Sequence, residues 1–380
     1  MMETHDLALR LKKARESVGL TLKSAADKMG FSNYQTLGSI ENGAREVKAA
    51  EIIKFSKIYY CSIDVLIGTG DHNDEKPRLL WRRAPEAHVR KMIEKRVHKL
   101  AEQCVWLQEA LTISSRRKFK TFVSDREEIA TNFKVDDIAR QARKSLDLGR
   151  RPSLSLKDAL EQQMGVVVIY DALSDAGSAA SMVHPRYGAI VVINSNESPW
   201  RQNYDLAHEL FHLYTWELFT QDELQDPVLF HDIERKADRF ASTLLLPSEE
   251  IQSRVHQKLD ENKKLSKADF VDIAREFGVS TQALAYRMKN ANLISWEVAD
   301  RIAKDEEVLG LSKDRRWDER EKAPKSEILT DLAIRGLRKS IISRGKFAEL
   351  CGIDRCDIDD FINEKGILYN DGESFEIMDS

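Results

Sequence analysis

The sequence predicts a mainly α-helical protein of the α+β class, with a small β-sheet near its middle. Apolar residues recur at intervals of three and four positions through most of the 380 residues, which is typical of amphipathic helices. Only two runs, 166–170 and 189–193, are rich enough in β-branched residues to predict strands. The chain is also longer than one hydrophobic core usually supports, so we expect two to four domains.

Composition indicates a soluble protein of a reducing compartment. The four cysteines are scattered and form no C-x-x-C pair, which argues against a disulfide framework or a zinc ribbon: Cys61, Cys104, Cys351 and Cys356. The N-terminus is polar, and no run approaches the ~18 apolar residues that span a bilayer. We therefore expect a cytoplasmic protein without a membrane anchor. The net charge of −4 is too small to imply a partner by itself.

The N-terminal segment, residues 6–68, is predicted to be a compact all-α domain. Its first apolar residues recur at helical spacing: Leu7, Leu11, Ala14 and Val18. Residues 69–84 are polar, with glycine and proline near the two ends of the most polar part, and are predicted to form a linker.

Residues 85–125 are predicted to form a basic helical connector. Six of its residues are spaced as in a short heptad seam: Ile93, Val97, Leu100, Cys104, Leu107 and Leu111. The seam lasts less than three heptads, so it either mediates a homodimer or packs against its own chain. Between Lys76 and Lys120, 13 Lys or Arg residues stand against 4 Glu, which indicates either a solvated helix face or contact with a nucleic-acid signal.

The pattern H-E-x-x-H occupies residues 208–212, on a helix expected directly after the strand 189–193. His208 and His212 are four residues apart, so both imidazoles lie on one helix face and can bind a single ion. This arrangement is typical of zinc, and we expect Zn²⁺ as the cofactor. Glu209 is placed to act as the catalytic base, because the ion lowers the pKa of a bound water toward ~7. The alternative is a packed helix face without a metal.

Catalytic zinc needs a third protein ligand, and Glu234 is the best candidate. It lies on a second expected helix, and Asp238 follows one turn later, where it can hydrogen-bond a ligating imidazole and fix its tautomer. Three other residues remain open as third ligands: His231, Glu223 and Asp238 itself. His184 is expected in a loop, outside the metal shell.

An extended polypeptide suits this geometry as the substrate. The strand 189–193 precedes the metal helix, so we expect its free edge to align a peptide by strand addition. Glu209 would take a proton from the attacking water and return it to the leaving amine. A loop of small residues, 174–181, is expected between the two strands.

Two motifs resemble those of the ImmA/IrrE family of metallopeptidases. The first reads N-Y-D-L-A-H-E-L-F-H over residues 203–212, and the second reads E-R-K-A-D-R-F-A-S-T-L-L-L-P over residues 234–247. The resemblance implies a zincin-like metallopeptidase domain over residues 126–250. It also implies three zinc ligands and one catalytic residue: His208, His212, Glu234 and Glu209. Phe211 departs from the glycine usual in the family, and its side chain either reshapes the pocket wall or tightens helix packing.

Residues 6–68 resemble the phage-repressor type of helix-turn-helix domain, called XRE. The resemblance places the first helix of the motif over residues 21–30 and the recognition helix over residues 32–42, which enters the major groove. Base contacts are expected from four residues: Asn33, Tyr34, Gln35 and Ser39. Phosphate contacts are expected from three: Lys23, Arg45 and Lys48. Leu22 and Gly38 depart from the family's common Gln and Ser, and docking of a protein is the alternative role.

The C-terminal part is predicted to be helical. Residues 251–310 resemble a second helix-turn-helix fold, which in this family often packs on the peptidase instead of reading DNA. Residues 325–380 are expected to form a helical module with an acidic tail.

The resemblance implies a zinc-dependent endopeptidase coupled to the regulation of transcription. Its expected substrate is a repressor-like protein or the chain itself, cleaved in response to stress or to a mobile-element signal. The expected partner of the N-terminal domain is double-stranded operator DNA. The alternative belongs to another class: a DNA-binding transcriptional regulator whose peptidase-like domain senses a ligand or metal without turnover.

Overall fold

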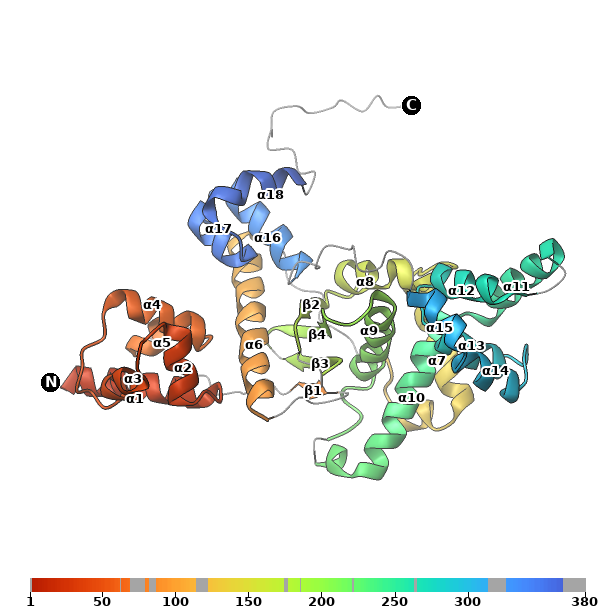
Figure 1. Cartoon of the computed structure of the whole chain (residues 1–380), viewed down its shortest axis with the longest axis horizontal. Coiled ribbons are helices and arrows are strands. Elements are labelled where there is room, and N and C mark those ends of the chain that lie inside the picture. The colour runs from red at the N-terminus through yellow and green to blue at the C-terminus, as the bar shows by residue number, and fades with distance from the viewer. Residues whose placement is uncertain are drawn as a thin grey trace.

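The protein is mainly helical with one small sheet, which confirms the predicted α+β class (Figure 1). This computed structural model describes residues 2–61, 63–68, 79–81, 87–113, 122–173, 177–184, 186–220, 222–262, 265–313 and 326–364. Several predicted segments lie partly outside the described residues, among them most of the linker 69–84, residues 85–86 and 114–121 of the connector, residues 174–176 of the predicted loop, and the acidic tail from residue 365. Among the described helices, none is long and apolar enough to cross a membrane.

The N-terminal unit is a group of short helices around a core of its own. Its helices are α1 (Met2–Ser17), α2 (Leu22–Met29), α3 (Tyr34–Glu41), α4 (Ala49–Ile58) and α5 (Ile63–Ile67). Phe55 and Tyr59 are fully buried in this core, and their rings stack with centroids 5.3 Å apart. Arg15 donates to both carboxylate oxygens of Glu41, at 2.7 and 2.8 Å, and this buried pair ties α1 to α3.

The described strands form one sheet in the order β1-β3-β4-β2. They are β1 (Leu80–Trp81), β2 (Val167–Asp171), β3 (Ala179–His184) and β4 (Gly188–Asn194). β2 and β4 match the two predicted runs and pair in parallel. β3 was not predicted, because the small residues at its start indicated a loop, and β1 is too short to give a sequence signal.

The prediction that the strand 189–193 offers a free edge is wrong. This strand is β4, which pairs with β2 along one side and antiparallel with β3 along the other. The side of β3 that faces away from β4 pairs with the two residues of β1.

Helices cover both faces of the sheet, with α6 and α9 on opposite sides (Figure 1). One core joins alternate strand residues such as Val168 and Val191 to four helices: α7 (Asn132–Ser145), α8 (Pro152–Gln162), α9 (Pro199–Tyr214) and α10 (Pro227–Leu245). The other core joins Val167 and Val192 to α6 (Ala87–Ala110) and α16 (Glu327–Arg338). The period of two along each strand explains this division.

The heptad seam packs against its own chain. Its six residues lie on or just after α6, and five of them are at most 5% exposed: Ile93, Val97, Cys104, Leu107 and Leu111. Leu100 is partly buried against the same core, which α16 and the sheet complete. The seam is therefore filled from within the chain and gives no support to a homodimer.

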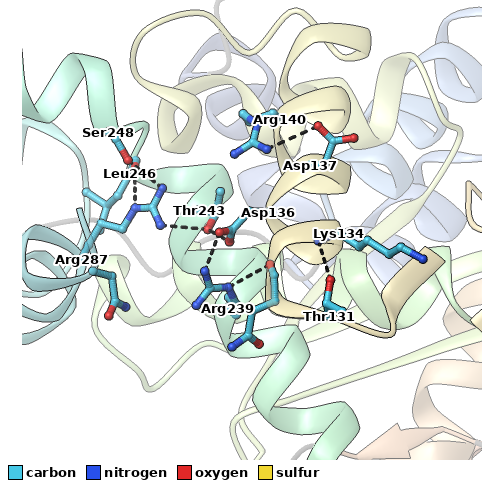
Figure 2. A network of polar contacts seen from close by, with 12 residues as sticks. Thr131, Lys134, Asp136, Asp137, Arg140, Arg239, Thr243, Leu246, Ser248 and Arg287 are labelled. Atoms are coloured by element: carbon cyan, nitrogen blue, oxygen red, sulfur yellow. Dashed lines mark hydrogen bonds and ion pairs between the residues drawn. The ribbon is translucent and has the colours of Figure 1, made fainter. Parts of the chain in front are cut away.

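The helices after α10 share a core with α7 to α10 and with one face of the sheet. They are α11 (Ser248–Asn262), α12 (Lys267–Glu276), α13 (Thr281–Asn290), α14 (Trp296–Ala303) and α15 (Glu306–Lys313). Buried Arg287 of α13 donates to the Leu246 carbonyl at 2.9 Å and to the hydroxyls of Thr243 and Ser248 at 3.0 Å each (Figure 2). Thr243 in turn donates to Asp136 of α7 at 2.8 Å. The segment 251–310, predicted as a separate helix-turn-helix-like unit, thus packs against α7 and α10 and shares their core.

The last described helices form a module that rests on α6. They are α16, α17 (Arg344–Cys351) and α18 (Ile358–Glu364). The described residues also include three short 3₁₀ helices: η1 (Arg126–Ile129), η2 (Glu223–Gln225) and η3 (Arg355–Asp357). Lys157 of α8 links this module to the sheet domain, because its ammonium contacts Glu327 of α16. The same ammonium lies 3.1 Å from Glu161 of its own helix.

Candidate metal centre

Helix α9 carries the H-E-x-x-H pattern into the interior of the protein. The helix begins at Pro199, whose fixed φ suits a first helical position, and every residue from 205 to 214 is buried. Polar side chains rarely lie in a core without partners. The two histidines must therefore find their partners inside the protein, and Glu234 and Asp238 of α10 supply them.

Three side chains with potential ligand atoms converge between α9 and α10. His208 Nε2 lies 3.0 Å from His212 Nε2 and 3.3 Å from Glu234 Oε2, while His212 Nε2 lies 3.1 Å from Glu234 Oε1. In a tetrahedral zinc site with bonds of ~2.0–2.1 Å, neighbouring ligand atoms are about 3.3 Å apart. The three side chains thus need to shift by only a few tenths of an ångström to hold an ion, and the donor set leaves a fourth position open.

Electrostatics at Glu234 also suit a ligand. Burial raises the pKa of its carboxyl, but contacts with His208 and His212 outweigh burial and lower the pKa to about 2. The carboxylate is therefore ionised at neutral pH, which is the form that binds a metal. Two imidazoles and one carboxylate form a donor set typical of catalytic zinc, so these residues fit the ion.

Asp238 lies behind one of the histidines. Its Oδ1 is 3.0 Å from His208 Nδ1, the ring nitrogen that faces away from Glu234. A carboxylate at this nitrogen accepts its proton and leaves Nε2 free to bind a metal. Tyr204 of α9 donates to the main-chain carbonyl of Asp238 at 2.9 Å, which further connects the two helices.

Two of the other candidates for a third ligand, Glu223 and His231, lie elsewhere. Both carboxylate oxygens of Glu223 are 2.8 Å from Arg126 Nη2, and His231 is exposed on α10. His184 is the last residue of β3 and not part of a loop, and its ring stacks on that of Tyr187 at 4.4 Å. It lies near His98 of α6, on the face of the sheet opposite α9.

Glu209 is fully buried beside the ligand atoms. Burial raises the pKa of its carboxyl, whereas the His212 and His208 imidazoles and the Ser181 hydroxyl oppose that rise. Within the described part of the chain, neither oxygen of Glu209 has a hydrogen bond of normal geometry. Sequence reasoning missed Ser181, which lies in β3 within the run predicted as a loop, and no local pattern pointed to it.

The expected DNA-contacting residues lie on and around α2 and α3. Thr21 caps α2, Gly30 ends it in the left-handed conformation, and Asn33 caps α3 by accepting the Gln35 amide at 2.9 Å. Four of the expected contact residues are exposed besides Asn33: Lys23, Tyr34, Gln35 and Lys48. Ser39 is half-buried and donates to the Gln35 carbonyl at 3.0 Å.

Arg45 is placed differently from the other expected phosphate contacts. Its guanidinium donates to Glu51 at 2.8 Å and lies over the Phe31 ring, 5.7 Å from the centroid. These contacts stabilise the turn between α3 and α4, and the Glu51 carboxylate neutralises much of the charge of the Arg45 guanidinium. Arg45 is therefore half-buried and paired, whereas Lys23 and Lys48 are exposed.

Two parts of the chain match the models of known protein families. Residues 161–289 match the model described as an IrrE N-terminal-like domain, and residues 11–66 match the helix-turn-helix model. The chain joins an N-terminal helix-turn-helix domain to an IrrE-type domain. Residues 315–376 match an uncharacterised protein family, UPF0175, and this range contains α16 to α18.

Parts of the chain are also similar to two individual proteins. The HTH-type transcriptional regulator ImmR of Bacillus subtilis (strain 168) is 37% identical over 62 residues, which are 16% of this chain and 48% of ImmR. The chain thus spans about half the length of this curated relative. A Mycobacterium tuberculosis transcriptional regulator of known structure is 16% identical, with a TM-score of 0.31, over 49% of this chain and 51% of that one.

Phe211 tightens helix packing in the IrrE-type domain. Its side chain is fully buried, and its ring centroid lies 5.6 Å from that of Phe240 on α10. The side chain therefore fills the contact between the two helices that bear the ligand atoms.

Part of the basic connector is committed to contacts within the chain. Arg96 pairs with Asp171 at the end of β2, and Lys95 donates to Ser17 of α1. Arg90 lies 3.9 Å from Glu94 on the same helix. The positive charge of α6 is thus balanced in part by its own surroundings.

Proposed function

We propose that this protein is a zinc-dependent endopeptidase joined to a DNA-binding domain, and that His208, His212 and Glu234 hold the ion. The observation that supports it most is the convergence of their ligand atoms between α9 and α10. Glu209 adds to this support, because burying a carboxylate without a strong hydrogen-bond partner destabilises a core helix, and a catalytic role would explain why it is there.

The side chains divide the chemistry of hydrolysis among them. When bound, zinc acts as a Lewis acid and lowers the pKa of a coordinated water toward ~7. Glu209 takes a proton from the attacking water and later delivers it to the leaving amine. Its raised pKa suits the second of these transfers, since burial favours the protonated form. Asp238 accepts the proton of His208 Nδ1 and so keeps the imidazole in one orientation.

The N-terminal domain suggests where this activity is used. Exposed Gln35 and Tyr34 on α3 are presented as a recognition helix presents its base-contacting residues, and Lys23 and Lys48 flank them. We infer that the domain binds double-stranded operator DNA. The IrrE-type domain then cleaves a repressor-like protein or its own chain in response to stress or a mobile-element signal. The match of 62 residues of this chain to the transcriptional regulator ImmR supports a role in transcription.

A coexpression experiment tests the peptidase directly. Wild type and Glu209→Gln are each expressed with repressors encoded by neighbouring genes, and products are identified by mass spectrometry. We expect cleavage only with the wild type. Equal cleavage would remove Glu209 from the mechanism. The absence of cleavage in zinc-loaded protein under inducing stress would favour a regulator whose IrrE-type domain senses a ligand or metal.

A further inference from the structure

The outer edge of β3 is the part of the sheet that adjoins the metal centre. Side chains alternate along this strand, so Ser181 points toward Glu209 of α9, whereas Ala180 and Met182 join the core on the α6 side. β4 covers the inner edge of β3 over its whole length. An extended polypeptide that reaches this centre by strand addition must therefore pair with the outer edge.

The chain itself already pairs with this edge. In β1, Leu80 lies opposite Ser181 and Trp81 lies opposite Ala180, in the antiparallel direction. Directly opposed residues of an antiparallel pair place their side chains on the same face. The half-buried Leu80 side chain thus lies on the face of Glu209, and the Trp81 side chain lies on the face of α6.

Trp81 fixes the segment in place from the far side of the sheet. Its side chain is 7% exposed, and its indole N–H donates to Glu94 Oε1 of α6 at 3.2 Å. A side chain at Gly177 would contact the Trp81 ring, which shows how closely the chain before β3 approaches it. Leu79 is also buried in this core, at 8% exposure. The backbone pairing is only two residues long, so these buried side chains carry most of the attachment.

We propose that residues 79–81 act as an intramolecular competitor at the substrate edge of β3. This inference rests on the proposed peptidase function. A polypeptide substrate must displace the segment before it can pair beside Ser181. The segment is part of the same chain, so its effective concentration at the edge is high and does not depend on dilution. Loosening Trp81 should therefore open the edge without any change in the side chains at the metal centre.

A binding experiment tests the competitor without requiring turnover. The probe is a fluorescein-labelled synthetic peptide with the sequence of residues 76–85, K-P-R-L-L-W-R-R-A-P, and its anisotropy is followed with the full chain carrying Glu209→Gln. Adding Trp81→Ser should lower the Kd for this peptide at least about tenfold, which corresponds to about 1.4 kcal/mol. Trp106→Ser is the matched control, because Trp106 lies on α6 with 44% exposure and outside this pairing.

An unchanged Kd in a Trp81→Ser protein that retains wild-type circular dichroism would overturn the proposal. If that variant does not fold, Glu94→Leu keeps Trp81 and removes its acceptor, together with the exposed contact between Glu94 and Arg90. A smaller fall in Kd is then expected, and no fall would overturn the proposal equally.

The same variants with Glu209 intact separate this inference from the peptidase function. The kcat/KM for cleavage of the peptide should rise about tenfold with Trp81→Ser. Tighter binding without cleavage by any variant would support the competitor and contradict the peptidase. Cleavage by wild type with no gain in binding or rate from Trp81→Ser would contradict the competitor alone.

Discussion

Replacing Asp238 by alanine should weaken zinc binding while leaving all three proposed ligands in place. The lost contact is the one between Asp238 Oδ1 and His208 Nδ1, at 3.0 Å. Partners of this kind contribute about 10- to 100-fold to metal affinity, or about 1.4–2.7 kcal/mol. The Asp238 side chain is 45% exposed, so water can partly replace it, and we expect an effect near the lower end, about tenfold.

Competition with a zinc-binding dye at constant pH measures this effect. Asp232→Ala is the matched control, because it removes the same charge from the same helix but breaks only pairs with Arg235 and Lys236. Glu234→Ala should lose far more affinity, since it removes a ligand atom. If Asp238→Ala and Asp232→Ala bound zinc equally tightly, the orienting role given to Asp238 would be refuted.

Three further predictions address other parts of the chain. Gln35→Ala should weaken binding to the cognate operator by about 1–3 kcal/mol. Lys48→Ala should reduce the slope of log affinity against log salt by about 1 without changing sequence preference. Fluorescence titration measures both effects, and unchanged binding would show that the DNA site lies elsewhere. Arg287→Met should lower the free energy of unfolding by about 3 kcal/mol, because it strands buried acceptors that Arg287 now satisfies, and urea unfolding that matched wild type would contradict this. Burial, opposed by Lys157, raises the pKa of Glu161 to about 7 from an ordinary 4.5, so the stability contributed by its protonated carboxyl is lost as the pH rises from 4.5 to 7. The melting temperature of Glu161→Gln relative to wild type should therefore be higher at pH 8 than at pH 5. An equal difference at both pH values would exclude the effect.

Local spacing predicted which residues of the candidate site lie together. The i, i+4 interval of His208 and His212 follows from helix geometry alone, and so does the one-turn interval that places Asp238 beside an imidazole. The approach of α10 to α9 is a tertiary contact, which was expected only because Glu234, on a second expected helix, was chosen as the third ligand. The caps at Thr21 and Asn33 likewise reflect local chemistry that a sequence can reveal.

Features that depend on pairing between distant segments were not predicted. β3 begins with small residues that favour a loop, and its strand conformation depends on its pairing with β4. β1 has two residues, so its position depends on the burial of Trp81 against α6 and not on any strand propensity. The heptad seam of α6 packs against α16, which lies more than 200 residues further along the chain. A local repeat cannot distinguish this intramolecular packing from packing against a second copy of the chain.

Zinc content is the most direct test of the central claim that His208, His212 and Glu234 form a metal centre. Purified wild type, His212→Ala and Glu209→Gln, each treated with the same zinc buffer and then desalted, are compared by inductively coupled plasma mass spectrometry. We predict close to one zinc per chain in wild type and in Glu209→Gln, which alters a buried neighbour on the same helix, and almost none in His212→Ala. Full retention of zinc by folded His212→Ala, or its absence from wild type, would contradict the assignment.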